Sequence, residues 1–278
     1  MIACNNTRLI PSVKILDQKT KVQLPVHKKP TFLCIIPNMF LHLIFAVLGF
    51  FIGMLINSLA DFLPTWRRAE TAVSWQWTPS GLWQLVRGQA ARRRPWLVEL
   101  STLLLFAVLP ALIPAWQNLF VNSFHIAVLI LIIVIDLENR LIFDIVIYPA
   151  TIIALLGSFV VTREENSIRL ALVGAVTGFV IFGLLYMAAQ WRYGAGSGAL
   201  GAGDVKLALA MGAMLGFHRI LFALGLGILL GGVISFLLLL SRRVNRQSHL
   251  PYGQYLATAA IIMLIWGAQL AQRYMQPV

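Results

Sequence analysis

Residues 119–149 read LFVNSFHIAVLILIIVIDLENRLIFDIVIYP, two apolar runs separated by a short polar turn. The first run, and the second together with its continuation to about residue 162, approach the roughly 20 residues with which an α-helix crosses a bilayer core of about 30 Å. A helix satisfies its backbone hydrogen bonds within its own segment, so it is stable inside lipid, whereas a lone strand is not. The stretch therefore predicts two membrane helices joined by a turn that carries acidic and basic residues.

Apolar blocks of similar length recur through all 278 residues, of which 59% are hydrophobic and only 12% charged. They predict about eight spans, at roughly 35–62, 97–115, 119–137, 144–162, 169–191, 205–217, 219–240 and 252–271. The span at 205–217 is short, because a dozen residues rise only about 18 Å, and we expect a partial or re-entrant helix there. The predicted fold class is all-α, a polytopic membrane helical bundle.

Polar segments divide these spans into three regions. Residues 1–31 form a polar, basic tail, residues 32–115 hold the first two spans with a loop at about 64–96, and residues 116–278 hold six further helices. No secretory signal is expected, because the first apolar block begins only near residue 32 and lacks a small-residue cleavage site.

The formal net charge is +12, and the basic residues gather in the short segments between spans. Positive charge there fixes the orientation of a membrane protein and meets anionic lipid head groups, so no nucleic acid partner is needed to explain it. The loops after the first, third, fifth and seventh spans are the most basic and are predicted to be cytoplasmic. The basic N-terminal tail then lies on the outer side of the membrane, against the rule that positively charged segments stay in the cytoplasm. The run Arg92-Arg93-Arg94 is interpreted as a solvated or lipid-facing patch. Neither Cys4 nor Cys34 belongs to a C-x-x-C pair, so we expect no disulfide framework and no metal site.

Only ten residues are acidic, and Asp136, Asp144 and Asp204 are among those at predicted cytoplasmic ends of spans. An ionised carboxylate at the bilayer centre costs roughly 2.5–3.5 kcal/mol, so each requires a reason. Asp144 precedes an apolar run and is explained as a helix cap, an explanation that suits Asp204 in part. Asp136 lies near the C-terminal end of its span, where the helix dipole opposes a negative charge. Glu99 is expected to open the second span and to gain from the dipole there.

Two carboxylates at one membrane depth on separate helices suit aspartic proteolysis, in which one deprotonated acid activates water and a protonated one polarises the scissile carbonyl. Because a helix N-terminus favours an anion, Asp204 is the candidate base and Asp136 the candidate acid.

The segment YGAGSGALGAGDVK, residues 193–206, precedes the short span. It fits the dinucleotide pattern G-x-G-x-x-G, but an apolar span stands where that pattern requires a strand in a βαβ unit. The glycines are better explained by close backbone approach and positive φ, which would allow an extended peptide to lie beside Asp204.

Residues 201–207, GAGDVKL, resemble the G-x-G-D-x-K-[LM] segment of the type IV prepilin peptidases, a family of membrane aspartic proteases. Asp136, followed by Arg140-Leu141-Ile142, resembles the other catalytic segment of that family, with Phe143-Asp144 in place of the usual Pro-Asp. Asp144 therefore stays the alternative to Asp136 as the first catalytic acid, and Asp136 is preferred. Further similar segments are GMLIN at 53–57, PWLVELSTLLLF at 95–106 and PYG at 251–253.

The resemblance implies that residues 116–278 form a peptidase domain that removes the leader from prepilins or pseudopilins, in type IV pilus assembly or protein secretion. It places the active site on the cytoplasmic side of the bacterial inner membrane, with Asp136 and Asp204 catalytic and Gly201, Gly203, Lys206 and Asp144 supporting them or binding substrate. Proteolysis of this kind uses no cofactor.

Larger members of the family carry two zinc-binding C-x-x-C pairs in the first cytoplasmic loop and also methylate the new N-terminus from S-adenosylmethionine. Residues 64–96 contain no cysteine, so no zinc is expected, and S-adenosylmethionine would be a cofactor only if methylation were retained.

Three points stay open at this stage. Lys206 is expected to pair either with a dyad carboxylate or with a lipid phosphate. Intramembrane acids also build proton relays, so a proton-coupled transporter is the alternative function. A non-catalytic scaffold descended from the enzyme is a third reading.

Overall fold

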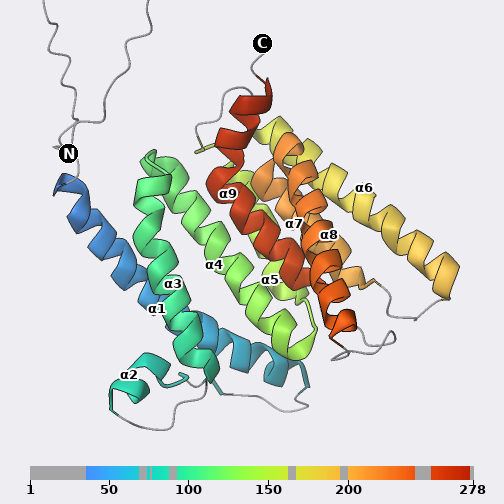
Figure 1. Ribbon diagram of the computed structural model, residues 1–278. Coiled ribbons are helices and arrows are strands. Elements are labelled where there is room, and N and C mark those ends of the chain that lie inside the picture. Colours follow the sequence, from blue (N-terminus) through green and yellow to red (C-terminus); the bar gives the residue numbers. More distant parts are fainter. Residues whose placement is uncertain are drawn as a thin grey trace, which may run out of the picture. The chain divides into compact units, whose positions relative to one another are not determined.

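The computed structural model describes residues 36–68, 74–75, 77–87, 93–161, 167–194, 200–241 and 252–275. Every regular element in this part of the chain is a helix, so the predicted all-α class is confirmed (Figure 1). The predicted N-terminal tail, 1–31, lies outside the described residues. The helices are α1 (Ile36–Arg68), α2 (Gly81–Val86), α3 (Arg93–Leu112), α4 (Trp116–Asn139), α5 (Asp144–Gly157), α6 (Ser167–Tyr193), α7 (Ala202–Leu215), α8 (Phe217–Leu240) and α9 (Gly253–Met275).

Five of the described helices, α1, α3, α4, α6 and α8, are long and apolar enough to cross a membrane. Their outward side chains are large and apolar, with Phe51, Leu184 and Leu237 each more than half exposed. A surface of this kind is stable against lipid and not against water. The chain is a multi-pass membrane protein.

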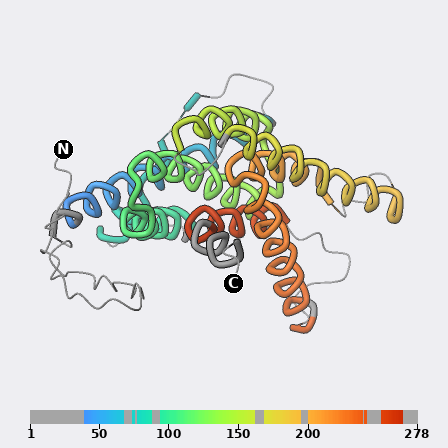
Figure 2. Tube along the Cα trace, turned by 90° about the horizontal axis from the view of Figure 1, so that it is seen from above, coloured from blue at the N-terminus to red at the C-terminus, as the bar shows by residue number. Residues whose placement is uncertain are grey.

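The short helix expected after the glycine segment is α7, whose 14 residues rise about 21 Å. It packs against α5, α6, α8 and α9, and ten of its residues are buried. The backbones of α6 and α7 touch where Gly174 meets Gly212, and a side chain at either glycine would collide with the other helix. Helices α6 and α8 contact each other and then diverge, so that their C-terminal ends lie apart (Figure 2).

The loop predicted at 64–96 is partly helical, which the sequence did not indicate. Helix α1 continues through Pro64 to Arg68, and the loop contains α2. The six residues of α2 are too few to form a stable helix alone. Their N-terminus is held by Glu99, whose carboxylate accepts hydrogen bonds from the Ser80 hydroxyl and from two backbone amides, at 2.9–3.0 Å.

The expectation that Glu99 opens the second span is therefore wrong. Helix α3 begins at Arg93, so Glu99 lies in its second turn, is only 1% exposed, and stabilises the N-terminus of a different helix.

Candidate active site

Asp136 and Asp204 are both buried, with 4% and 7% of their surfaces exposed. Asp136 lies in the last turn of α4, and Asp204 in the first turn of α7. They are close enough for their charges to interact. Asp144, the first residue of α5, is by contrast half exposed, with 53% of its side-chain surface accessible.

The N-terminus of α9 holds the carboxylate of Asp136. Its Oδ2 atom accepts a hydrogen bond from the backbone amide of Gln254 at 2.9 Å, across 118 residues of sequence. The first amides of a helix have no partner within the helix, and they carry the positive end of the dipole. A negative charge that the end of α4 disfavours is thus stabilised by the start of α9.

This contact alters the basis for the predicted division between acid and base. That prediction assumed that only Asp204 stands at a helix N-terminus, whereas both carboxylates do. The assignment of Asp204 as base and Asp136 as acid stays a prediction, without the difference in helix ends that motivated it.

Asp204 is the third residue of α7, and its Oδ2 atom accepts a hydrogen bond from the backbone amide of Gly201 at 3.2 Å. A Cβ atom on Gly201 would lie 3.3 Å from that oxygen, and one on Gly203 would lie 2.9 Å from the Ile142 side chain. Gly201 has an ordinary φ of −81°. At Gly201 and Gly203, therefore, close approach requires glycine, whereas Gly194, earlier in the same segment, has the expected positive φ, of 89°.

A third glycine, Gly253, lies against the carboxylate of Asp136. A Cβ atom at this position would lie 3.0 Å from Asp136 Oδ2 and 3.0 Å from Ile142 Cδ1. Ile142, in the turn between α4 and α5, thus contacts the backbone beside both aspartates. In the sequence, Gly253 stands out only as part of the segment PYG at 251–253, because no feature of the neighbouring residues indicates that it lies near Asp136.

Tyr252 stands just before α9 and contacts the Phe182 ring of α6, with ring centroids 6.3 Å apart. Burial raises the pKa of Tyr252 to about 12, and the nearby charge of Asp204 adds to the shift. The phenol therefore stays protonated, and able to donate a hydrogen bond beside the dyad, at any physiological pH.

Lys206 forms an ion pair with Asp144, with Nζ 2.8 Å from each carboxylate oxygen. Neither of the two partners expected from the sequence, a dyad carboxylate or a lipid phosphate, takes part in this pair. The prediction that Asp144 caps α5 is also wrong, because the N-cap is Phe143 and the Asp144 side chain is turned toward Lys206.

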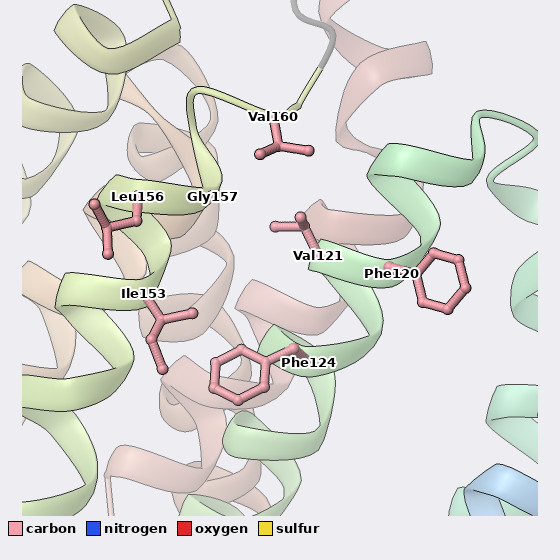
Figure 3. Close-up of a pocket in the computed structure, with 7 residues that line it drawn as sticks. All are labelled: Phe120, Val121, Phe124, Ile153, Leu156, Gly157 and Val160. Carbon is pink, nitrogen blue, oxygen red and sulfur yellow. The ribbon is translucent and has the colours of Figure 1, made fainter.

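An apolar pocket between α4 and α5 lies at the opposite end of α4 from Asp136 (Figure 3). Phe120, Phe124, Ile153 and Leu156 are among the side chains that line it. It contains no group suited to acid–base chemistry. Nor do three or more potential metal ligands gather anywhere in the described ranges.

Residues 123–236 match the type IV leader peptidase family. A prepilin leader peptidase/N-methyltransferase of Aeromonas hydrophila is 31% identical over 207 residues, covering 73% of this chain and 68% of the relative. Proteins of the same name from Aeromonas salmonicida (strain A449) and Pectobacterium carotovorum subsp. carotovorum are also 31% identical, over 211 and 178 residues. These two alignments cover 74% and 61% of this chain and 69% and 59% of the relatives.

The chain belongs to the type IV leader peptidase family. The resemblance found in the sequence is confirmed. No solved structure shows significant similarity to the chain. The segment that matches the leader peptidases runs from the first half of α4 into α8 and includes both buried aspartates.

Proposed function

We propose that this leader peptidase is a membrane aspartic endopeptidase that removes the leader from type IV prepilins or pseudopilins. The observation that carries the proposal is the pair of buried carboxylates, Asp136 and Asp204, contributed by separate helices and each hydrogen-bonded by backbone amides. The names of the relatives supply the substrate class.

Like charges in one buried site cannot both ionise easily, so the two carboxyl groups share a proton. The deprotonated member removes a proton from water, which attacks the scissile carbonyl, while the protonated member donates its proton to the carbonyl oxygen. We assign Asp204 as the base and Asp136 as the acid. Gly201 and Gly203 support the site by letting the Asp204 and Ile142 side chains approach the backbone, and Lys206 and Asp144 support it as well.

The site belongs on the cytoplasmic side of the bacterial inner membrane. In the sequence, the most basic loops follow the first, third, fifth and seventh predicted spans, the same ends as Asp136 and Asp204, and positive charge marks the cytoplasmic end of a span. At that depth a basic leader stays in water while the hydrophobic segment that follows it stays in lipid. The partners are thus the prepilin and the surrounding lipid.

The proposal covers proteolysis alone. The relatives are named N-methyltransferases as well, but the cysteine-free loop gives no support for zinc or for methyl transfer. Nothing in the comparisons favours proton-coupled transport, the alternative drawn from the sequence.

The test is cleavage of a membrane-inserted prepilin by the purified protein, with product masses read by mass spectrometry. We expect Asp136→Asn and Asp204→Asn to abolish cleavage and Asp144→Asn to retain it. A folded wild-type protein that cuts none of the prepilins of its own genome contradicts the proposal. Adding S-adenosylmethionine to the same assay shows, by a product heavier by one methyl group, whether methylation is retained.

A further inference from the structure

The last turn of α4 is held on two sides. Asp136 contacts the N-terminus of α9, and Glu138, two residues later, accepts a hydrogen bond from Arg94 Nη1 at 2.6 Å. Residues two apart on an α-helix point about 200° apart, so the two contacts fall on nearly opposite faces of the turn. Together they oppose both rotation and fraying of the segment that carries Asp136.

Arg94 also contacts α1. Its Nη2 atom lies 2.7 Å from Asp61 Oδ1 and 3.5 Å from the backbone oxygen of Asn57. Asp61 in turn accepts a hydrogen bond from the Thr78 hydroxyl at 2.8 Å. One guanidinium thus joins α1, α3 and α4 at the end of the bundle that carries the dyad, and its side chain is only 21% exposed.

This arrangement corrects the interpretation of the arginine run as a solvated or lipid-facing patch, as far as Arg94 is concerned. The planar guanidinium presents separate N–H groups to two carboxylates at once, which the single ammonium of lysine does with less defined geometry.

We propose that Arg94 is a positioning residue for catalysis, which acts by fixing the last turn of α4 through Glu138. Helix ends fray because their last carbonyls lack partners within the helix. Here α4 ends at Asn139 and its C-cap residue, Arg140, has a left-handed φ of 52°. A catalytic group on such a turn needs support from neighbouring side chains, since displacement by about 1 Å can reduce a rate about 100-fold.

The inference rests on the proposed function, and its test separates the two. The variants are Arg94→Gln, Glu138→Gln and their combination, with Asp61→Asn to remove the ion pair of Arg94 with α1 while the ion pair with Glu138 stays. Arg87→Gln is the matched control, because Arg87 is exposed and lies over the Trp83 ring, 4.7 Å from its centroid. Values of kcat and KM are measured on one prepilin, together with thermal unfolding and hydrogen exchange of residues 136–139.

We expect Arg94→Gln and Glu138→Gln to lower kcat about 10- to 100-fold with little change in KM. The double variant should lose no more than Arg94→Gln alone, because Arg94→Gln already removes the contact to Glu138. Asp61→Asn should have a smaller effect and Arg87→Gln none. Exchange at residues 136–139 should accelerate in the Arg94 and Glu138 variants, while the melting temperature stays near that of the wild type.

Three results decide against the inference. If the wild type cleaves prepilin and Arg94→Gln retains its kcat, Arg94 does not position the dyad. If the loss of kcat merely follows a general loss of stability, the role is structural. If the wild type cleaves nothing, the proposed function fails and the catalytic role with it, whereas hydrogen exchange still shows whether Arg94 holds the turn.

Discussion

Lys206 on α7 and Asp144 on α5 form an ion pair in which Nζ is equidistant, at 2.8 Å, from both carboxylate oxygens. Lys206 stands two residues after Asp204, just as Glu138 stands two residues after Asp136. Each dyad aspartate is therefore followed by a charged side chain that is bound to another helix, Glu138 to α3 and Lys206 to α5. Ion pairs attach both carboxylate-bearing turns to their surroundings.

The Asp144–Lys206 pair should contribute little to stability, because both side chains are one-third exposed or more. Exposed pairs are worth about 0–1 kcal/mol. We expect Asp144→Asn to change the free energy of unfolding by less than about 1 kcal/mol, to keep measurable cleavage, and to lower kcat less than Asp136→Asn does. Steady-state kinetics and chemical denaturation in detergent check this. Complete loss of cleavage in Asp144→Asn would instead identify Asp144 as the first catalytic acid.

Gly253→Ala should impair catalysis, because the added methyl group would lie 3.0 Å from Asp136 Oδ2. A displacement of about 1 Å can cost about 100-fold, so we expect kcat to fall by at least about tenfold. The control is Gly232→Ala, whose Cβ meets no atom within 4 Å. In a helix that change stabilises by about 0.5–1 kcal/mol and should leave kcat unaltered. Equal activity of the two variants would show that Asp136 tolerates the contact.

Glu99→Gln should release α2, because a neutral amide cannot accept all three hydrogen bonds that the buried carboxylate accepts. Hydrogen bonds to charged groups contribute about 1.5–3 kcal/mol each, and we expect a loss of about 2–3 kcal/mol in stability. Limited trypsin digestion at Arg87 should become faster. Ser80→Ala removes only one of the three contacts and should show a smaller change; a protease-resistant loop in Glu99→Gln would mean that α2 is held by other contacts.

Tyr252 should not titrate within the working pH range of the enzyme, because its pKa is raised to about 12, chiefly by burial. The phenol is protonated in the folded state up to that pH, whereas in the unfolded chain it ionises near pH 10. Its contribution to stability is therefore complete below pH 10 and is lost as the pH rises from 10 to 12. The melting temperature of the wild type should fall relative to that of Tyr252→Phe over that interval, and the activity profiles of both proteins between pH 5 and 9 should have the same shape. A change of the alkaline limb in Tyr252→Phe would show that the phenol takes part in proton transfer.

Much of the fold could be predicted from the sequence, because the apolar blocks are local features and lipid imposes helical structure on each of them. The short helix after residue 201 was also predicted from a local feature, because its apolar segment has too few residues to span the bilayer core as a helix. The family resemblance also depended only on short segments, and the comparisons confirmed it.

The partners of the charged residues depended on tertiary structure alone. Asp136 contacts an amide 118 residues away, Arg94 a carboxylate 44 residues away, and Lys206 one that is 62 residues away. No periodicity encodes such pairs, so the predictions for Glu99, Arg94 and the Asp144 cap were wrong, and Lys206 has a protein partner, Asp144, that the sequence did not indicate. The sequence by itself determined which segments enter the membrane and which carry acids, whereas the packing of the helices, α4 against α9 for Asp136 and α5 against α7 for Asp144, decided what surrounds each acid.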